Sequence, residues 1–197
     1  MKTGLILFVR NPILGQVKTR LAKTLGNETA LRIYRHLLEY TYAITRDLDC
    51  DKFVFYADAI TQLDLWENDQ YHKRLQSGAD LGQRMQYAFA ALFQMGYEKA
   101  IIIGSDCLEL TPEIIQKGFL QLEGNDVVIG PSADGGYYLL GMKQVQSVLF
   151  QGKTWSTDSV LNDTLADCRR QSLTYSLLPQ LNDIDEEKDV PENLLKS

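Results

Sequence analysis

Short apolar runs alternate with segments of helical periodicity along most of the chain. A short run of apolar residues without polar alternation is typical of a strand that is buried on both faces of a parallel sheet. Such runs lie at residues 4–9, 53–56, 100–103, 127–129 and 137–140, and a shorter strand is expected near 173–178. This pattern predicts an open sheet in which most strands run parallel.

Apolar positions spaced three and four residues apart predict the helices between these strands. The stripe from Ala30 to Leu48 predicts a long helix after the first strand, and a stripe over 160–168 predicts one before the last strand. The region 59–77 shows neither pattern, and we assign no element to it.

Two further helix starts are marked by capping residues. Asp80 is placed to cap one helix, with Gln83 in position to complete a capping box. Thr111-Pro112 opens another, because Thr is a good cap and Pro suits the first turn. The resulting β-α-β-α order predicts an α/β protein: one domain over residues 1–197, with three α/β/α layers and a Rossmann-like, mostly parallel mixed sheet.

Composition excludes several classes of protein. With 45% hydrophobic and 23% charged residues in 197, the chain resembles an ordinary soluble globular protein. No stretch approaches the roughly 18 apolar residues of a membrane span, and the first apolar run is too short for a signal peptide. Three widely spaced cysteines indicate neither a disulfide framework nor a zinc site, so we expect a cytoplasmic protein. Two histidines and no G-x-S-x-G segment argue against a serine hydrolase.

The formal charge of −6 is unevenly distributed. Residues 1–36 hold seven Lys and Arg against one acid, a net of +6, and the remainder holds thirteen basic and twenty-five acidic residues, a net of −12. The total argues against a general nucleic-acid binder, which usually has a basic excess. This uneven distribution predicts that an anionic partner would bind the N-terminal part of the chain.

Ligands of such sheets bind beyond the carboxyl ends of the strands, so polar residues directly after strands are site candidates. The first such loop, over 10–23, carries four cations and no acid, and it runs into a helix at about Lys18. Cations and backbone N–H groups at a helix start suit a phosphate chain, a role that we favour over a solvated basic loop. The G-x-x-x-x-G-K-[ST] frame is absent, which excludes a Walker ATPase. The candidate residues of this loop are Arg10, Gly15, Lys18, Thr19 and Arg20.

A second polar segment, Gly104-Ser-Asp-Cys107, follows the apolar run 100–103. A carboxylate here suits Mg²⁺, which prefers oxygen ligands and often shares them with substrate phosphates. A capping or structural role for Asp106 is equally open. If the strand order reverses in the usual way, 100–103 lies beside 4–9 and Asp106 lies beside the basic loop, which favours the metal site. Cys107 has no adjacent base, so a packed thiol is favoured over a nucleophile.

Two later segments carry weaker signals. Asp134 precedes two glycines, which suits a turn that a ligand approaches closely or an ordinary hairpin. Trp155 suits stacking on a base or a sugar, and Asp158 is a candidate second metal ligand, although a helix cap in this segment is equally open. The run 182–190, taken alone, is an exposed acidic face.

Together these segments resemble a known group of proteins. The order of Lys18-Thr-Arg-Leu21, G-S-D, G-P-x-x-D-G-G-Y-Y-L-x-G, W-S-T and D-I-D-x-x-x-D resembles the GT-A fold. Within that fold, the chain is similar to the nucleotide-diphospho-sugar transferase-like family related to phospholactate guanylyltransferase. This family includes the proteins called radical-SAM/selenodomain-associated transferases, which are designated glycosyltransferases mostly from their fold. The match spans roughly residues 4–190, and the KTRL and DGGYYL segments are its most specific parts.

The resemblance implies roles for individual residues. Lys18 and Arg20 would contact nucleotide phosphates, and Asp106 would hold a divalent metal, Mg²⁺ or Mn²⁺. Asp80 and Arg84 belong to a D-L-G-x-R segment that flanks the nucleotide. The acceptor or sugar side would be lined by Asp134, Gly135, Gly136 and Trp155.

The expected reaction is a group transfer from a nucleotide donor to a small-molecule acceptor. Lys18, Arg20 and a metal ion on Asp106 would neutralise the charge on the leaving phosphate. The donor is a nucleoside triphosphate, which the cationic loop favours, or a nucleotide-sugar, which the family's usual label favours. A non-catalytic nucleotide-binding protein is the alternative, because the chain lacks a clear general base and has Leu108 where the family usually has Pro.

Overall fold

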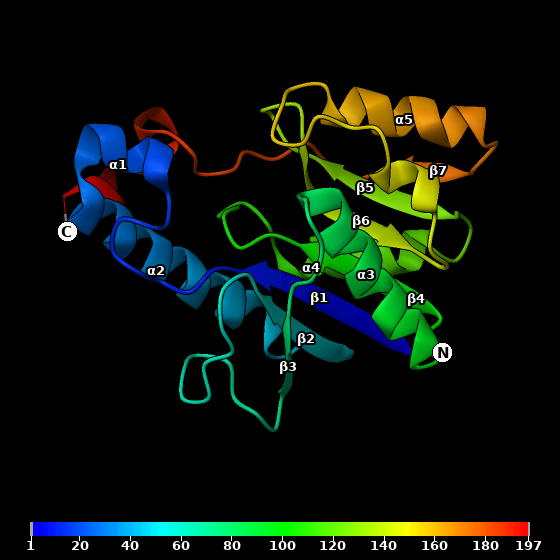
Figure 1. Cartoon of the computed structure of the whole chain (residues 1–197), viewed down its shortest axis with the longest axis horizontal. Helices are drawn as coiled ribbons and strands as arrows, with labels where there is room; N and C mark the ends of the chain where they lie inside the picture. Colours follow the sequence, from blue (N-terminus) through cyan, green and yellow to red (C-terminus); the bar gives the residue numbers. More distant parts are fainter. Residues whose placement is uncertain (1, 197) are drawn as a thin grey trace.

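The computed structural model describes residues 2–196 and arranges seven strands of this range in one sheet, in the order β3-β2-β1-β4-β6-β5-β7 (Figure 1). Among the described residues, β6 alone runs antiparallel to its neighbours, β4 and β5. The mostly parallel mixed sheet that the sequence predicts is therefore confirmed. The strands are β1 (Thr3–Val9), β2 (Asp51–Tyr56), β3 (Tyr71–Leu75), β4 (Lys99–Ile103), β5 (Val127–Pro131), β6 (Tyr137–Met142) and β7 (Tyr175–Leu177).

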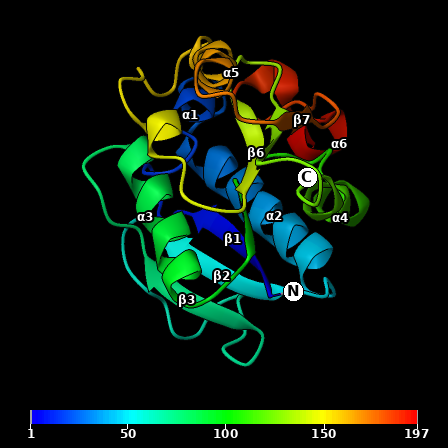
Figure 2. The same ribbon diagram turned by 90° about the vertical axis from the view of Figure 1, so that its right-hand side faces the viewer.

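Helices cover both faces of the sheet. Leu5 and Leu7 of β1 pack in one core with α2 and α4, whereas Ile6 lies in the opposite core with α3 and α5. Figure 2 shows α2 and α3 on opposite sides of β1 and β2. Within residues 2–196, none of the helices is long and apolar enough to cross a membrane. They are α1 (Thr19–Leu25), α2 (Asn27–Thr45), α3 (Leu81–Gln94), α4 (Pro112–Gln121), α5 (Val160–Arg170) and α6 (Glu192–Leu195), with 3-10 turns η1 (Ser147–Phe150) and η2 (Glu187–Asp189).

The structure contains one strand that the sequence pattern misses. β3 lies in the region 59–77 and forms the edge of the sheet beside β2. Of its residues, Tyr71 alone is buried, and three basic side chains, His, Lys and Arg, follow it. A charged strand of this kind suits a sheet edge, and it lacks the apolar run by which buried strands are found.

The long helix after β1 needs correction at both ends. The stripe from Ala30 to Leu48 predicts its core, but α2 begins at Asn27 and ends at Thr45. Gly26 separates α2 from the shorter α1, and its φ of +82° is a conformation that glycine adopts without strain. The helix start expected at about Lys18 is confirmed, because α1 begins at Thr19, and Gly26 ends this short helix before α2.

Both predicted helix caps are present. The Thr111 hydroxyl accepts from the backbone N of Ile114 at 3.4 Å at the start of α4. The Asp80 carboxylate accepts from the backbone N of Gln83 at 2.8 Å at the start of α3. The capping box is not completed as predicted, because the Gln83 side chain accepts from the backbone N of Ala79 at 3.1 Å and not from that of Asp80.

The strand order reverses between β1 and β4, which are parallel neighbours with Leu7 opposite Ile103. β2 and β3 continue on one side of β1, and β6, β5 and β7 continue on the far side of β4. The loops that leave the carboxyl ends of β1 and β4 therefore meet at one edge, the usual ligand position of such sheets.

The C-terminal segment returns across the same edge. Leu181 forms a parallel bridge with Ser132, just before the turn that joins β5 to β6. Three residues later, the backbone N of Ile184 donates to the carbonyl of Asp106 at 2.8 Å. The reversal point is thus surrounded by the loops after β1 and β4, the β5–β6 turn and the segment 181–185.

Candidate functional site

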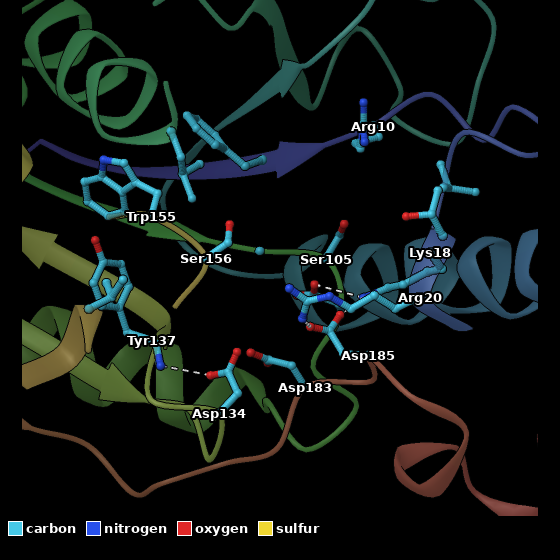
Figure 3. Close-up of a pocket in the computed structure, with 18 of the residues that line it drawn as sticks. Arg10, Lys18, Arg20, Ser105, Asp134, Tyr137, Trp155, Ser156, Asp183 and Asp185 are labelled. Atoms are coloured by element: carbon cyan, nitrogen blue, oxygen red, sulfur yellow. Dashed lines mark hydrogen bonds and ion pairs between the residues drawn. The ribbon is translucent and has the colours of Figure 1, made fainter. Parts of the chain in front are cut away.

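A cavity of about 440 Å³ opens at this edge of the sheet (Figure 3). It brings together residues that are far apart in the sequence, from 8–20, 34, 81, 104–106, 134–137, 155–160 and 183–185. Three kinds of side chain dominate its lining. They are the cations Arg10, Lys18 and Arg20, the carboxylates Asp106, Asp134, Asp183 and Asp185, and the aromatic rings Phe8, Tyr34, Tyr137 and Trp155.

Lys18 is the most enclosed cation of the cavity, with a side chain that is 8% exposed. It stands directly before α1 with φ 46° and ψ 48°, and its ammonium donates to Asp106 Oδ2 at 3.1 Å and to Asp185 Oδ1 at 3.0 Å. Burial opposes the charge of Lys18, but the two carboxylates outweigh burial and raise its pKa. Lys18 is therefore a fixed cation at neutral pH.

The other two cations reach further into solvent. The Arg20 guanidinium is 3.4 Å from Asp185 Oδ2, and its side chain is 58% exposed. Arg10 is similarly exposed and lies 3.9 Å from Asp58. Their loose contacts leave both guanidinium groups able to turn toward an anion in the cavity.

Tyr34, which the sequence reasoning missed, joins the loops after β1 and β4. Its hydroxyl accepts from the backbone N of Arg10 at 2.8 Å and lies 3.2 Å from the Arg10 carbonyl and 3.5 Å from Ser105 Oγ. Burial raises the pKa of Tyr34, so the hydroxyl remains a neutral hydrogen-bonding group. Tyr34 belongs to the apolar stripe of α2, where the sequence alone indicates a core residue.

The acidic segment 182–190 is exposed only over 186–188, whereas the sequence taken alone predicts an exposed face throughout. Ile184 is buried, and its hydrogen bond to Asp106 holds this extended segment in place. Asp183 and Asp185, on either side of Ile184, both line the cavity. In the sequence, the apolar Ile184 between two acids is the signal that one side chain of this segment is buried.

Of these two acids, Asp183 is the one whose negative charge the site disfavours. Its Oδ1 atom is buried and has no hydrogen-bond partner among residues 2–196. Burial, and after it the negative charge of Asp106, raise the pKa of Asp183 to about 7. The apposition of Asp106 and Asp183 is therefore unfavourable unless a cation or a proton joins them.

The β5–β6 turn brings Asp134 to the cavity through a close backbone contact. The backbone N of Gly136 donates to Asp134 Oδ1 at 2.9 Å. Gly135 has φ +88°, and a Cβ atom there would lie 2.2 Å from the carbonyl oxygen of Asp158. Asp158 thus supports the turn through its backbone, and it is not among the residues that line the cavity.

Trp155 and Tyr137 form an aromatic wall at the end of the cavity opposite Lys18 (Figure 3). The Trp155 ring lies against Gly82 in the first turn of α3, where a Cβ atom would come within 2.4 Å of it. The Tyr137 hydroxyl contacts Met85 Sδ at 3.8 Å. Trp155 is therefore held beside α3, with part of its ring facing the cavity.

Several sequence candidates lie outside the cavity lining. Asp80 caps α3, and Arg84 Nε donates to the carbonyl of Gly78 at 3.3 Å. Gly15 lies in a turn with φ +76°, and Gly135 lies in the turn that presents Asp134 but does not itself line the cavity. Of the loop after β1, Arg10, Lys18, Thr19 and Arg20 do line the cavity.

Cys107 is unsuited to nucleophilic chemistry. Its side chain is buried, and burial raises the pKa of the thiol to about 12, with a further contribution from the charge of Asp183. Since the thiolate is the reactive form, this thiol is inert at neutral pH. The packed role that the sequence favours agrees with this placement.

The described residues contain no complete metal centre. Within residues 2–196, no three His, Cys, Asp or Glu side chains are gathered as ligands of one ion. Mg²⁺ in phosphate-processing sites is usually held by one or two carboxylates together with substrate phosphates and water. Asp106 and Asp183, with the unpartnered oxygen of the latter, are suited to such a partial set.

Comparisons with known proteins place the chain in a family. The profile of DUF2064, described as an uncharacterized protein conserved in bacteria, matches residues 40–157. A solved structure from Desulfovibrio desulfuricans G20, described as a "putative nucleotide-diphospho-sugar transferase", is 32% identical. That alignment covers 94% of this chain and 84% of the other, with a TM-score of 0.86. No curated protein matches the chain.

Two more distant structures share the fold. The inositol-1-phosphate CTP transferase of T. maritima is 13% identical, over 100% of this chain and 94% of the other, with a TM-score of 0.59. A 4-diphosphocytidyl-2C-methyl-D-erythritol synthase is 12% identical, over 95% of this chain and 94% of the other, with the same TM-score of 0.59. At these identities the likeness shows the fold alone, and it confirms the expected GT-A-like architecture.

Proposed function

Because the chain belongs to the DUF2064 family, we propose that it is a metal-dependent transferase that moves a nucleotidyl or glycosyl group from a nucleotide donor to a small acceptor. The Desulfovibrio desulfuricans structure, similar over most of both chains and described as a "putative nucleotide-diphospho-sugar transferase", supports this class. The observation that carries the proposal is Lys18, a buried cation held between Asp106 and Asp185 at the reversal point of the sheet.

The phosphates of the donor bind at the cationic end of the cavity. Lys18 supplies a fixed charge, and Arg10 and Arg20 supply mobile guanidinium groups that suit bidentate contact with phosphate oxygens. An incoming phosphate competes with Asp106 and Asp185 for Lys18. It thereby frees Asp106 for a metal ion that accompanies the donor.

Asp106 and Asp183 are the residues that would hold this ion, with donor phosphates completing its ligand set. The fit rests on the buried, unpartnered oxygen of Asp183 and on its repulsion with Asp106. When bound, Mg²⁺ or Mn²⁺ supplies positive charge that offsets the negative charge on the leaving phosphate. Asp158, whose side chain is outside the cavity lining, is replaced by Asp183 in this proposal.

The acceptor reaches the donor from the side of Asp134, Gly136 and Trp155. In nucleotidyl transfer, an acceptor oxygen bonds to the α-phosphorus, pyrophosphate leaves, and the acceptor hydroxyl loses its proton to solvent. In glycosyl transfer, the acceptor oxygen bonds to the anomeric carbon and the nucleoside diphosphate leaves. Three cations at one end of the cavity favour the longer phosphate chain of a triphosphate.

Donor consumption and donor binding together test the proposal. The protein is incubated with Mg²⁺, a mixture of small alcohols and sugars, and each of several nucleoside triphosphates and nucleotide-sugars. Pyrophosphate and nucleoside diphosphate are followed over time, and affinity is measured by calorimetry. The class of donor consumed decides between the two transfers. Binding without consumption favours the non-catalytic nucleotide-binding protein, and no binding of any donor refutes the proposal.

Two variants sharpen this test. Lys18→Ala should lose most of the donor affinity, whereas Lys23→Ala, an exposed cation on α1 outside the cavity, should retain it. Asp106→Asn should abolish the effect of Mg²⁺ on donor binding. Unchanged affinity and an unchanged metal response in both site variants would contradict the assignment.

A further inference from the structure

The charges of the cavity are segregated. Its three cations, Arg10, Lys18 and Arg20, all come from the loop after β1 and the start of α1. Figure 3 shows Lys18 and Arg20 at one end, Trp155 and Tyr137 at the other, and Asp134 and Asp183 between them. Among the described residues that line the cavity, no cation stands at the aromatic end.

The aromatic end offers a flat apolar surface. Trp155 is fixed against Gly82, and Leu81 of the same turn of α3 also lines the cavity. Figure 3 shows the Tyr137 hydroxyl directed toward Trp155, and this hydroxyl donates to the weak sulfur acceptor of Met85 at 3.8 Å. This hydroxyl can therefore donate a stronger hydrogen bond to a ligand oxygen without giving up a good partner.

The polar groups next to this wall accept hydrogen bonds or repel anions. Asp134 is exposed, and the Gly136 amide donates to one of its two carboxylate oxygens. Asp183 also lies between the two ends of the cavity, and the exposed Ser156 lines the cavity there (Figure 3). A phosphate or carboxylate placed here would meet negative charge with no cation to offset it.

From this segregation we infer that the second substrate is a hydroxyl compound or amine with an apolar face and without a phosphate or carboxylate group. It packs its apolar face on Trp155 and Tyr137 and donates a hydroxyl or ammonium hydrogen to Asp134. Asp134 is then a specificity residue that rejects anionic acceptors. The inference rests on the proposed function, because it assigns the cationic end to the phosphates of the donor.

A matched pair of ligands tests the inference. Inorganic triphosphate with Mg²⁺ fills the cationic end without presenting a base. The probes are 4-nitrophenyl β-D-glucopyranoside and its 6-phosphate, which differ by one phosphate group. Their dissociation constants are measured by ligand-observed NMR in the triphosphate-loaded protein. The neutral glycoside should bind at least tenfold more tightly than its phosphate ester, and Trp155→Ala should weaken it by a similar factor.

Charge variants complete the test. Asp134→Asn should reduce the preference for the neutral probe severalfold by improving the binding of the phosphate ester, whereas Asp69→Asn, the same change on an exposed loop, should leave it unaltered. Equal or tighter binding of the phosphate ester would overturn the inference, as would the absence of binding by the neutral probe. Displacement of the glycoside by nucleoside triphosphates but not by inorganic triphosphate would place the base at Trp155 and would also overturn it. Failure of the triphosphate itself to bind would instead count against the proposed function.

Discussion

The Lys18 ammonium lies 3.1 Å from the Asp106 carboxylate, although 88 residues separate the two in the sequence. This contact joins the loop after β1 to the loop after β4 at the point where the strand order reverses. Forming a partly buried ion pair of this kind requires both charged groups to lose water. Its net contribution to stability is therefore small compared with the cost of removing one partner and leaving the other charge unpaired. Its position suggests that the charges are kept for binding.

Replacing Lys18 by Met should weaken the binding of a nucleoside triphosphate with Mg²⁺ by at least about tenfold, or about 1.4 kcal/mol. It should also lower the free energy of unfolding by roughly 1–3 kcal/mol, because Asp106 and Asp185 lose their shared cation. The cost is below that of a fully buried pair, since these carboxylates are 37% and 35% exposed. Calorimetry and urea denaturation measure the two effects. Lys23→Met is the control, and unaltered triphosphate affinity in Lys18→Met would contradict the assignment.

Asp183→Asn should stabilise the metal-free protein at pH 8 and have little effect at pH 4. The folded-state pKa of about 7 lies above the ordinary value of 3.8, so the folded state binds more protons between these limits. Stability of the wild type therefore falls as the pH rises from about 4 to 7, and a neutral amide removes this loss. We expect a gain of about 1 kcal/mol or more at pH 8, equivalent to roughly 2–4 °C in Tm.

Thermal unfolding in the presence of a chelator, across pH 4 to 8, checks this pH dependence. Asp185→Asn provides the comparison, because it removes an acid from the same segment that is already paired with Lys18 and Arg20. A stability difference between Asp183→Asn and wild type that does not grow with pH would count against the raised pKa of Asp183.

Gly135→Ala should destabilise the protein by at least about 2 kcal/mol, from backbone strain and from overpacking. Its φ is +88°, and the new methyl group would lie 2.2 Å from the Asp158 carbonyl oxygen. Gly124→Ala is the matched control, because no atom lies within 4 Å of a Cβ there. Urea denaturation of both variants measures the difference, and equal stability of the two would show that the turn does not need this close approach.

Cys107 should resist alkylation by iodoacetamide in the folded protein at pH 8. Burial raises its pKa to about 12, so roughly one thiol in ten thousand is ionised at that pH. Peptide mass spectrometry should detect modification of this residue only in urea. Cys107→Ala should retain donor binding, and a loss of binding without a loss of folding would contradict its assignment as a packing residue.

Much of the fold can be predicted from periodicity in the sequence, because buried strands and amphipathic helices have regular patterns of apolar residues. Ile101 and Phe89, for example, lie in such patterns and are fully buried. β3 has no such pattern, because this edge strand has basic side chains at most of its positions. Asp106 and Lys18 were accessible as site residues because each directly follows a buried strand or belongs to a one-sided run of charge.

Tyr34 and Asp183 show why the rest of the site was not accessible. Tyr34 occupies a core position of α2. The sequence does not show that its hydroxyl lies between the loops after β1 and β4. Asp183 belongs to a segment whose path depends on contacts with distant loops, among them the hydrogen bond of Ile184 to Asp106 and the bridge of Leu181 to Ser132. Long-range contacts of this kind are set by the tertiary structure and carry no local signal.

The pairing of Lys18 with Asp185 also has a consequence for synthesis of the chain. These residues are 167 positions apart, so the ribosome releases the cation long before its second carboxylate exists. A chain that stops before residue 183 therefore keeps all three cations of the cavity and lacks two of its four carboxylates.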